Sequence, residues 1–324
     1  MIPNSPNDAE NQAKSWLNRR YHNYNYYLQN TYGEKIRKVS LHGGFTCPNR
    51  DGSKGFGGCV YCNNDSFVPH YINNEMSIPD QMEASIPFMV DRYNVQKYIA
   101  YFQAYSNTYD KLEKLKQMYE EAIGYPNIVG LDIGTRSDCI DIPLLEYLAQ
   151  LNEKVQVTLE FGIESIHDES LTWMNRGHDY ESVVKAIELT KQYGIKVAGH
   201  VILGFPVETR EMMFQTGIAA NDLKLDFLKI HQLHVVKRTV LANRYEKEPF
   251  PLFQADEYIE LVADILERLN PEIVIQRLFG DAPDDILIAP RWGYNIPKLT
   301  HLMDVELNQR DTWQGKYYQL KIKN

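Results

Sequence analysis

The stretch that decides the fold holds three of the four cysteines of the chain, and it reads Thr46-Cys47-Pro48-Asn49-Arg50-Asp51-Gly52-Ser53-Lys54-Gly55-Phe56-Gly57-Gly58-Cys59-Val60-Tyr61-Cys62. Eleven residues separate Cys47 from Cys59, and two separate Cys59 from Cys62. The longer gap is rich in glycine, which offers no side chain to pack in a buried helix or strand. Its backbone can instead approach a ligand closely, and three thiolates on such a loop predict a metal site.

Two kinds of metal site suit these cysteines. A structural zinc ion needs four protein ligands, and here Cys139 is distant in the sequence, so His42 or His70 would have to be the fourth. An iron–sulfur cluster held by three cysteines leaves one iron open for a substrate or cofactor. Inert or redox-active thiols are a third interpretation.

The composition is that of a globular protein with a substantial core. The chain has 324 residues, of which 44% are hydrophobic and 24% charged, enough for one large barrel domain or two ordinary domains. No apolar run is long enough to span a membrane and no signal peptide is visible, so we expect no membrane partner. Four cysteines, three of them clustered, do not form a disulfide framework, which predicts a cytoplasmic, reducing location.

The charge is unevenly distributed. The net charge is −9, but eight basic and two acidic residues lie between Lys14 and Lys54, interleaved with tyrosines. Basic side chains contact phosphates and aromatic rings stack on unpaired bases, so this segment suits RNA. The alternative is a helix packed through its tyrosines with a solvated basic face.

Strand-like and helical segments alternate after the cysteine loop. We expect strands at residues 36–41, 97–103, 128–133, 155–161, 196–203, 226–234 and 273–277. The helices expected between and around them are at 14–30, 79–93, 109–123, 142–151, 167–174, 180–193, 209–223 and 254–270, with a loop at 238–253. Repeated β–α units imply parallel strands, and chemistry in parallel barrels collects where the strands end.

The cysteine loop, with an aromatic residue before its last cysteine, resembles the radical S-adenosylmethionine (SAM) superfamily, and specifically the YhcC/YtqA-type proteins of its Elongator-related branch. The other pieces that carry the resemblance are residues 134–139 (GTRSDC), 159–165 (LEFGIES), 174–178 (MNRGH), 199–206 (GHVILGFP) and 280–283 (GDAP). The resemblance implies an α/β fold, an open (β/α)6 partial TIM barrel. We expect an N-terminal tail and basic, aromatic helix at 1–30, the barrel at 31–280 and a C-terminal extension at 281–324.

The same resemblance implies the cofactors. Cys47, Cys59 and Cys62 would hold three irons of a [4Fe-4S] cluster, and the fourth iron would bind the amino and carboxylate groups of S-adenosyl-L-methionine. An electron from a reductant such as flavodoxin or ferredoxin would cleave SAM to a 5′-deoxyadenosyl radical, which removes a hydrogen atom from the substrate. The protein would supply position and exclusion of water.

Candidate SAM contacts follow the expected strands. Gln103 and Ser106 lie where many relatives have a Gly-Gly-Glu, and an ordinary polar turn is the alternative. Glu160 ends the fourth strand among apolar residues, and Arg176 has a planar fork suited to a carboxylate; a structural ion pair is the alternative for both. Ser137 and Asp138 are predicted to contact ribose or substrate, unless they only cap a helix. On the later strands, the residues predicted to border the adenine are Gly199, His200, Gly204, Ile230 and His231.

The substrate predicted from the resemblance is a tRNA wobble uridine. One concrete reaction converts carboxymethylaminomethyl-uridine to aminomethyl-uridine, because the glycine-like methylene has a weakened C–H bond. Fewer than 50 residues follow the last expected strand, which disfavours an acetyl-CoA-dependent reaction. The alternatives are radical chemistry on a small molecule such as a tetrapyrrole, and a non-catalytic zinc-containing RNA-binding module.

Overall fold

The computed structural model describes residues 16–63, 72 and 76–319. The chain forms two compact units. The first unit consists of Leu28–Ile163 and Leu171–Ala198, and the second consists of Met1–Tyr27, Glu164–Ser170 and Gly199–Asn324. The predicted tail at residues 1–13, and His70, lie outside the described residues.

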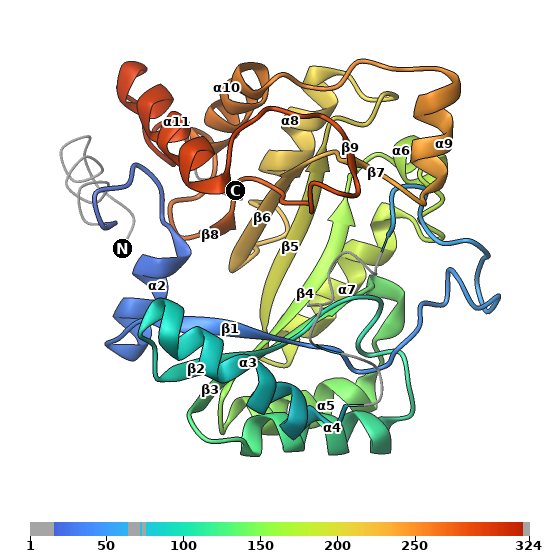
Figure 1. The fold of residues 1–324 in the computed structure, drawn as a ribbon, viewed down its shortest axis with the longest axis vertical. Helices are drawn as coiled ribbons and strands as arrows, with labels where there is room; N and C mark the ends of the chain where they lie inside the picture. Colours follow the sequence, from blue (N-terminus) through green and yellow to red (C-terminus); the bar gives the residue numbers. More distant parts are fainter. Residues whose placement is uncertain (1–15, 64–71, 73–75, 320–324) are drawn as a thin grey trace, which may run out of the picture. The chain divides into compact units, whose positions relative to one another are not determined.

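The first unit is built on four neighbouring parallel strands: β1 (Ile36–Leu41), β2 (Lys97–Phe102), β3 (Ile128–Thr135) and β4 (Gln156–Glu164). The helices of this unit are α3 (Ile78–Tyr93), α4 (Leu112–Gly124), α5 (Ile142–Asn152) and α7 (Tyr180–Gln192), with a short 3-10 helix, η2, at Ser137–Cys139. Figure 1 shows α3, α4 and α5 together on one side of β1–β3. This arrangement leaves the other side of these strands for the inner face of a barrel.

Local sequence explains why these helices form where they do. In α4, Leu115, Tyr119 and Ala122 are buried and lie on one stripe at helical spacing. Helix α3 begins after Ser77, whose side chain accepts a hydrogen bond from Asp80 N in a capping box. Helix α5 begins after Asp141, which accepts from Leu144 N.

The second unit contains a parallel pair, β6 (Phe227–Gln232) with β8 (Val274–Arg277), and an antiparallel pair, β7 (Val235–Val236) with β9 (Leu287–Ala289). Its helices are α8 (Arg210–Ile218), α9 (Val240–Lys247), α10 (Ala255–Leu266) and α11 (Ile296–Gln309). Four elements cross the boundaries of the units: α2 (Tyr24–Tyr32), β4, whose last residue Glu164 belongs to the second unit, α6 (Asp168–Trp173) and β5 (Lys196–Leu203).

The strand order is β1-β2-β3-β4-β5-β6-β8, which follows the order of the chain. Every interval between successive strands of this order contains at least one helix, as right-handed β–α units require. The protein therefore has the α/β fold of an open partial TIM barrel, and this prediction from the sequence is confirmed.

Three predicted elements were wrong in detail. The helix expected at 14–30 is α2, which begins only at Tyr24, and residues 16–18 form a turn. The loop expected at 238–253 contains α9, because Thr239 caps its first turn and Leu241 and Ala242 anchor it in the core. The helix expected at 209–223 ends at Ile218, and turns follow it.

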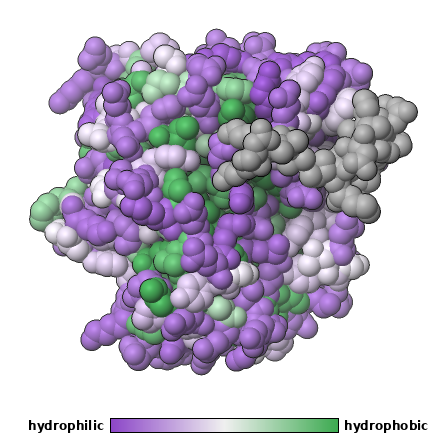
Figure 2. All heavy atoms as spheres, turned by 180° about the vertical axis from the view of Figure 1, so that it is seen from behind, coloured by the Kyte–Doolittle hydropathy of each residue, from purple (hydrophilic) through white to green (hydrophobic). Residues whose placement is uncertain are grey.

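The core of each unit is made of aliphatic and aromatic side chains, as the composition predicted. Figure 2 shows one face of the molecule, on which hydrophilic residues predominate and hydrophobic residues appear between them. In the part of the chain that the structure describes, no helix has both the length and the apolar character needed to cross a bilayer.

Candidate active site

The cysteine loop follows β1 and is shaped by hydrogen bonds within its own backbone. Arg50 N donates to Cys47 O at 2.8 Å, Gly58 N donates to Asn49 O at 2.9 Å, and Cys62 N donates to Cys59 O at 3.0 Å. Gly58 has a φ of +77°, and a Cβ there would lie 2.7 Å from Nε of Arg50. Glycine is therefore required at Gly58 both by its backbone angle and by the close approach of Arg50.

Residues of the MNRGH motif lie against this loop. Val60 N donates to Met174 O at 2.9 Å, and Asn175 Nδ2 donates to Gly58 O at 2.8 Å. In return, Asn49 Nδ2 donates to the carbonyl of Asn175. Two segments more than 100 residues apart in the sequence thus form one structure around Cys59.

Hydrogen-bond donors are directed at the sulfur of Cys59. Arg176 Nη1 lies 3.5 Å from Cys59 Sγ, and Asn49 Nδ2 lies 3.8 Å from the same atom. The second nitrogen of the Arg176 fork, Nη2, donates to Gly162 O at 2.6 Å. Such donors beside a cysteine sulfur are typical of the outer partners of a cluster ligand.

The Cys47 and Cys59 thiols lie close enough to Cys62 to affect its pKa. Burial raises the pKa of Cys62 to about 11, the Cys59 and Cys47 thiols add to this rise, and the charge of Arg50 opposes it. Binding to iron therefore has to displace protons from this site. Among the described residues, no three His, Cys, Asp or Glu side chains form a ready site for a single metal ion. A cluster has a different requirement, because each cysteine binds its own iron.

The GTRSDC motif after β3 forms a charged cluster. Arg136 donates to Asp138 from Nε at 2.8 Å and from Nη2 at 3.0 Å, and Lys54 of the cysteine loop donates to Asp138 at 2.9 Å. Burial alone would raise the pKa of Asp138, but Arg136 and Lys54 outweigh this effect and lower it. Asp138 thus does not cap α5, since that role belongs to Asp141.

Ser106 and Ser137, both predicted contacts of the bound cofactor or substrate, are buried beside these charged side chains. Ser106 Oγ accepts from Arg136 N at 3.3 Å and lies 3.2 Å from Thr135 Oγ1. Ser137 Oγ is buried and has no hydrogen-bond partner among the described residues. Gln103, predicted with Ser106, donates from Nε2 to Ser40 Oγ at 2.9 Å.

Glu160 lies in a buried ion-pair network, which is the alternative that the sequence left open. Its Oε1 is 2.6 Å from Lys38 Nζ, and the same ammonium is 2.5 Å from Asp132 Oδ2. Arg176, by contrast, contacts Cys59 and Gly162 as described above. A direct contact of Glu160 with SAM stays a prediction.

The remaining predicted contacts belong to the second unit. Gly204 has a φ of +114°, and a Cβ there would lie 3.4 Å from both Leu233 and Phe253, so the backbone turn favours glycine. The rings of His200 and His231 are 6.0 Å apart, and burial followed by Arg277 holds the pKa of His231 well below its usual range. Ile230 is fully buried. Gly199 lies beside His200 on β5.

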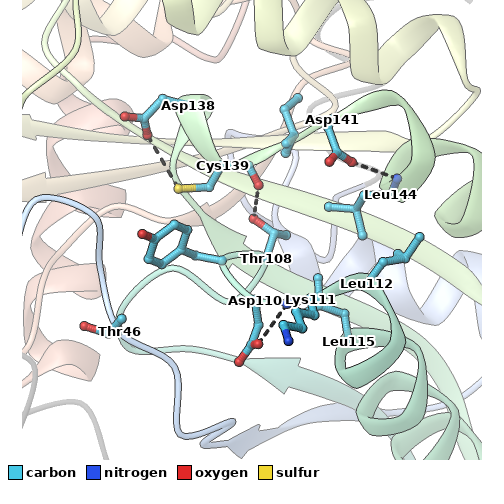
Figure 3. Close-up of a pocket in the computed structure, with 12 residues that line it drawn as sticks. Thr46, Thr108, Asp110, Lys111, Leu112, Leu115, Asp138, Cys139, Asp141 and Leu144 are labelled. Atoms are coloured by element: carbon cyan, nitrogen blue, oxygen red, sulfur yellow. Dashed lines mark hydrogen bonds between the residues drawn. The ribbon is translucent and has the colours of Figure 1, made fainter. Parts of the chain in front are cut away.

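A pocket of about 550 Å³ in the first unit contains the fourth cysteine. Figure 3 shows Cys139, Thr46 and Lys111 among its lining residues, and Thr46 directly precedes Cys47. Burial raises the pKa of Cys139 to about 12, which keeps this thiol protonated. Cys139 is only partly buried, although the sequence favoured a buried small residue.

Most of the basic side chains between Lys14 and Lys54 have protein partners. Arg19 pairs with Asp304, and Arg20 pairs with Asp311 at 3.1 Å. The guanidinium of Arg37 lies 4.9 Å from the centre of the Tyr93 ring. Lys38 and Lys54 pair with carboxylates, and Arg50 donates to a backbone carbonyl. Tyr24 and Tyr27 pack edge-on against Phe227. The tyrosines pack as the alternative expected, but these basic side chains have protein partners in place of the solvated face it described; Lys14 lies outside the described residues.

Sequence reasoning missed three residues around the cluster loop: Asn49, Arg50 and Arg136. Asn49 and Arg50 lie inside the loop itself, and Arg136 lies inside a motif that was recognised. Their side chains contact Cys59, Cys62 O and Asp138, respectively. One signal in the sequence could have indicated Asn49 and Arg50: they are polar side chains that follow Cys47 closely, in a loop with few other side chains.

Comparison with known proteins assigns the chain to a family. Residues 46–216 match the model of the Radical SAM superfamily, and residues 225–309 match that of the Radical_SAM C-terminal domain. The chain belongs to the radical SAM superfamily and is an enzyme of that class. Membership implies a [4Fe-4S] cluster and SAM, and it sets aside the zinc-module interpretation. The thiol loop with its N–H donors fits such a cluster.

Individual relatives refine this assignment. YtqA of Bacillus subtilis is 36% identical over 319 residues, covering 98% of each chain, and YhcC of Escherichia coli is 36% identical over 269 residues, covering 83% of this chain and 86% of YhcC. The tRNA uridine(34) acetyltransferase of Methanocaldococcus jannaschii is 27% identical over 176 residues, which are 53% of this chain and 32% of that protein.

Among solved structures, Methanocaldococcus infernus Elp3 superimposes with a TM-score of 0.64 at 19% identity, covering 86% of this chain and 64% of Elp3. This likeness shows the fold alone.

Proposed function

We propose that this radical SAM enzyme modifies the side chain of a tRNA wobble uridine. The observation that carries the proposal is the similarity of 176 residues of this chain to a tRNA uridine(34) acetyltransferase. The basic segment adds little support, because most of its described charges have partners within the protein. A cytoplasmic location, where tRNA is found, belongs to the same proposal.

The proposed reaction starts from carboxymethylaminomethyl-uridine. The cluster and SAM together supply a radical that takes one hydrogen atom from the substrate. Removal of that atom from the glycine-like methylene, followed by loss of one electron and one proton, gives an imine. The electron passes to a one-electron acceptor such as a flavodoxin- or ferredoxin-type protein. Water then hydrolyses the imine, leaving aminomethyl-uridine and releasing the two-carbon fragment as glyoxylate.

The side chains proposed to serve this reaction fall into two sets. Cys47, Cys59 and Cys62 bind three irons, and Arg176 donates to the Cys59 sulfur beside the place where SAM binds. The residues proposed to contact SAM are Gln103, Ser106, Ser137 and Asp138 in the first unit, and Gly199, His200, Gly204, Ile230 and His231 in the second.

The test is the nucleoside profile of tRNA from a strain in which the gene is deleted. Mass spectrometry should find carboxymethylaminomethyl-uridine accumulated and aminomethyl-uridine lost. Wild-type protein and Cys139→Ala should restore the profile, whereas Cys59→Ala should not. If the wobble uridines of the deletion strain are unchanged, the tRNA proposal is removed while the radical SAM assignment stands.

A further inference from the structure

A lysine on β1 is held between two carboxylates from other strands. Lys38 Nζ lies 2.5 Å from Asp132 Oδ2 on β3 and 2.6 Å from Glu160 Oε1 on β4. The same ammonium lies 4.6 Å from the centre of the Tyr101 ring on β2. All four strands of the first unit therefore contribute one side chain to this network. We call its three charged members, Lys38, Asp132 and Glu160, the Lys38 triad.

The three charged members are buried to different extents. The side chains of Asp132 and Glu160 are 1% and 0% exposed, whereas that of Lys38 is 17% exposed. The lysine is thus the most exposed of the three side chains. Burial of two carboxylates beside one ammonium is costly, so a structural role alone is a poor reason for this arrangement.

The ammonium stays charged in this setting. Burial by itself would lower the pKa of Lys38, but the carboxylates of Asp132 and Glu160 outweigh burial and raise it. Lys38 is therefore a permanent hydrogen-bond donor at ordinary pH.

The triad also lies close to the cysteine loop. Glu160 precedes Gly162 by two residues on β4, a separation of roughly 7 Å along a strand. The carbonyl of Gly162 accepts from Arg176, whose other nitrogen is 3.5 Å from Cys59 Sγ. The triad and the cysteine loop are therefore joined through β1, which leads into the loop, and through β4, whose Gly162 holds the arginine beside Cys59.

We propose that the Lys38 ammonium donates a hydrogen bond to an oxygen of bound SAM, and that Asp132 and Glu160 are positioning residues that hold this ammonium. The two carboxylates of the triad complement the positive charge that SAM carries at its sulfonium. In this proposal Glu160 acts through Lys38, which replaces the direct contact with SAM predicted from the resemblance. This inference rests on the proposed binding of SAM beside Cys59.

The first experiment measures the dissociation constant of SAM by anaerobic equilibrium dialysis, with protein of known iron content. Lys38→Met should weaken SAM binding about tenfold to a hundredfold, as expected for a lost charge-assisted hydrogen bond. The matched control is Lys97→Met, which removes a lysine paired at 2.8 Å with Glu34 at the start of β2. It should leave the affinity unchanged. An unchanged affinity for Lys38→Met at full iron content overturns the proposal.

A second comparison separates the positioning role of Glu160 from direct contact. Glu160→Gln should weaken SAM binding in the wild-type background and have no further effect in the Lys38→Met background. If Glu160→Gln weakens binding equally in both backgrounds, Glu160 itself contacts SAM and the positioning role is wrong.

Lys38→Met leaves two buried carboxylates without their cation and is at risk of misfolding. The variant Lys38→Met/Asp132→Asn/Glu160→Gln removes all three charges at nearly constant volume, and the same weakening is expected for it. The wild-type protein provides a further measurement, because it should bind cationic SAM several-fold more tightly than neutral S-adenosylhomocysteine. Equal affinities for the two overturn the proposed charge complementarity.

These results distinguish the inference from the proposals on which it depends. If the wild-type protein with a full cluster binds no SAM, the proposed site fails. If it binds SAM and the variants bind it equally well, only the role of Lys38 fails. The nature of the substrate does not affect either outcome.

Discussion

Arg176 Nη1 lies 3.5 Å from the Sγ of Cys59, which joins the connection between α6 and α7 to the loop after β1. The other end of the Arg176 fork is fixed on Gly162 O at 2.6 Å. Because a guanidinium carries a full positive charge, this contact ties the electronic state of a cluster ligand to the end of β4.

Replacing Arg176 by glutamine should make the reduction potential of the cluster more negative. Reduction adds negative charge to the cluster, and the lost cation would have stabilised that charge. We expect a shift of about 60 mV, equivalent to a tenfold change for one electron. Anaerobic redox titration followed by electron paramagnetic resonance measures it. Arg37→Gln, which removes a guanidinium lying over the Tyr93 ring, is the control, and equal potentials for both variants would contradict the role assigned to Arg176.

Replacing Cys59 by alanine should abolish cluster binding, whereas Cys139→Ala should not. Cys59 belongs to the predicted set of three ligands and its sulfur accepts from Arg176 and Asn49. Cys139 lies in a pocket beside Thr46, outside that set. Iron and sulfide analysis after anaerobic reconstitution should give about four irons per chain for Cys139→Ala. A comparable loss of iron in Cys139→Ala would mean that the fourth cysteine is also a ligand.

Gly177→Ala should destabilise the protein more than Gly194→Ala. Both glycines have positive φ, +76° and +70°, so each substitution incurs a backbone cost of about 1–2 kcal/mol. A Cβ at Gly177 would also lie 2.8 Å from Asn49 Oδ1, whereas at Gly194 it meets nothing within 4 Å. Urea unfolding measures the difference, and the iron content should fall only in Gly177→Ala. Equal losses in both variants would show that Asn49 moves aside without consequence.

Replacing His234 by glutamine should reduce the loss of stability in mild acid. Burial lowers the pKa of His234 to about 4, against the opposing effect of Asp281, whereas an unfolded histidine titrates near 6.5. Stability from the neutral ring is therefore complete above about pH 6.5 and is lost as the pH falls toward 4, by an amount on the order of 2–3 kcal/mol.

Urea unfolding at about pH 7 and about pH 5 tests this prediction. The His234→Gln protein should show a smaller change in unfolding free energy between the two values than the wild type. The exposed residue His301 provides the control, and His301→Gln should follow the wild type. An identical pH dependence for His234→Gln and wild type would mean that the buried ring is not the source of the acid sensitivity.

The sequence by itself determined the order of the strands, the location of most helices and the identity of the cysteine loop. These features are local, because hydrophobic periodicity and cysteine spacing are visible within a few turns or strands. Where local signals were weak, the prediction failed. The short helix α9 lies in a stretch with two prolines just beyond it, and its stability depends on the cap by Thr239 and on burial of Leu241.

Only the tertiary structure decided which partners the polar side chains have. Lys38, Asp132 and Glu160 are far apart in the sequence, and the parallel register of β1–β4 brings both carboxylates within 2.6 Å of the Lys38 ammonium. Lys38 belongs to the basic segment that suggested RNA binding, and the same register places its ammonium against two carboxylates inside the protein. Charge partners are set by strand register and loop packing, which no local pattern encodes.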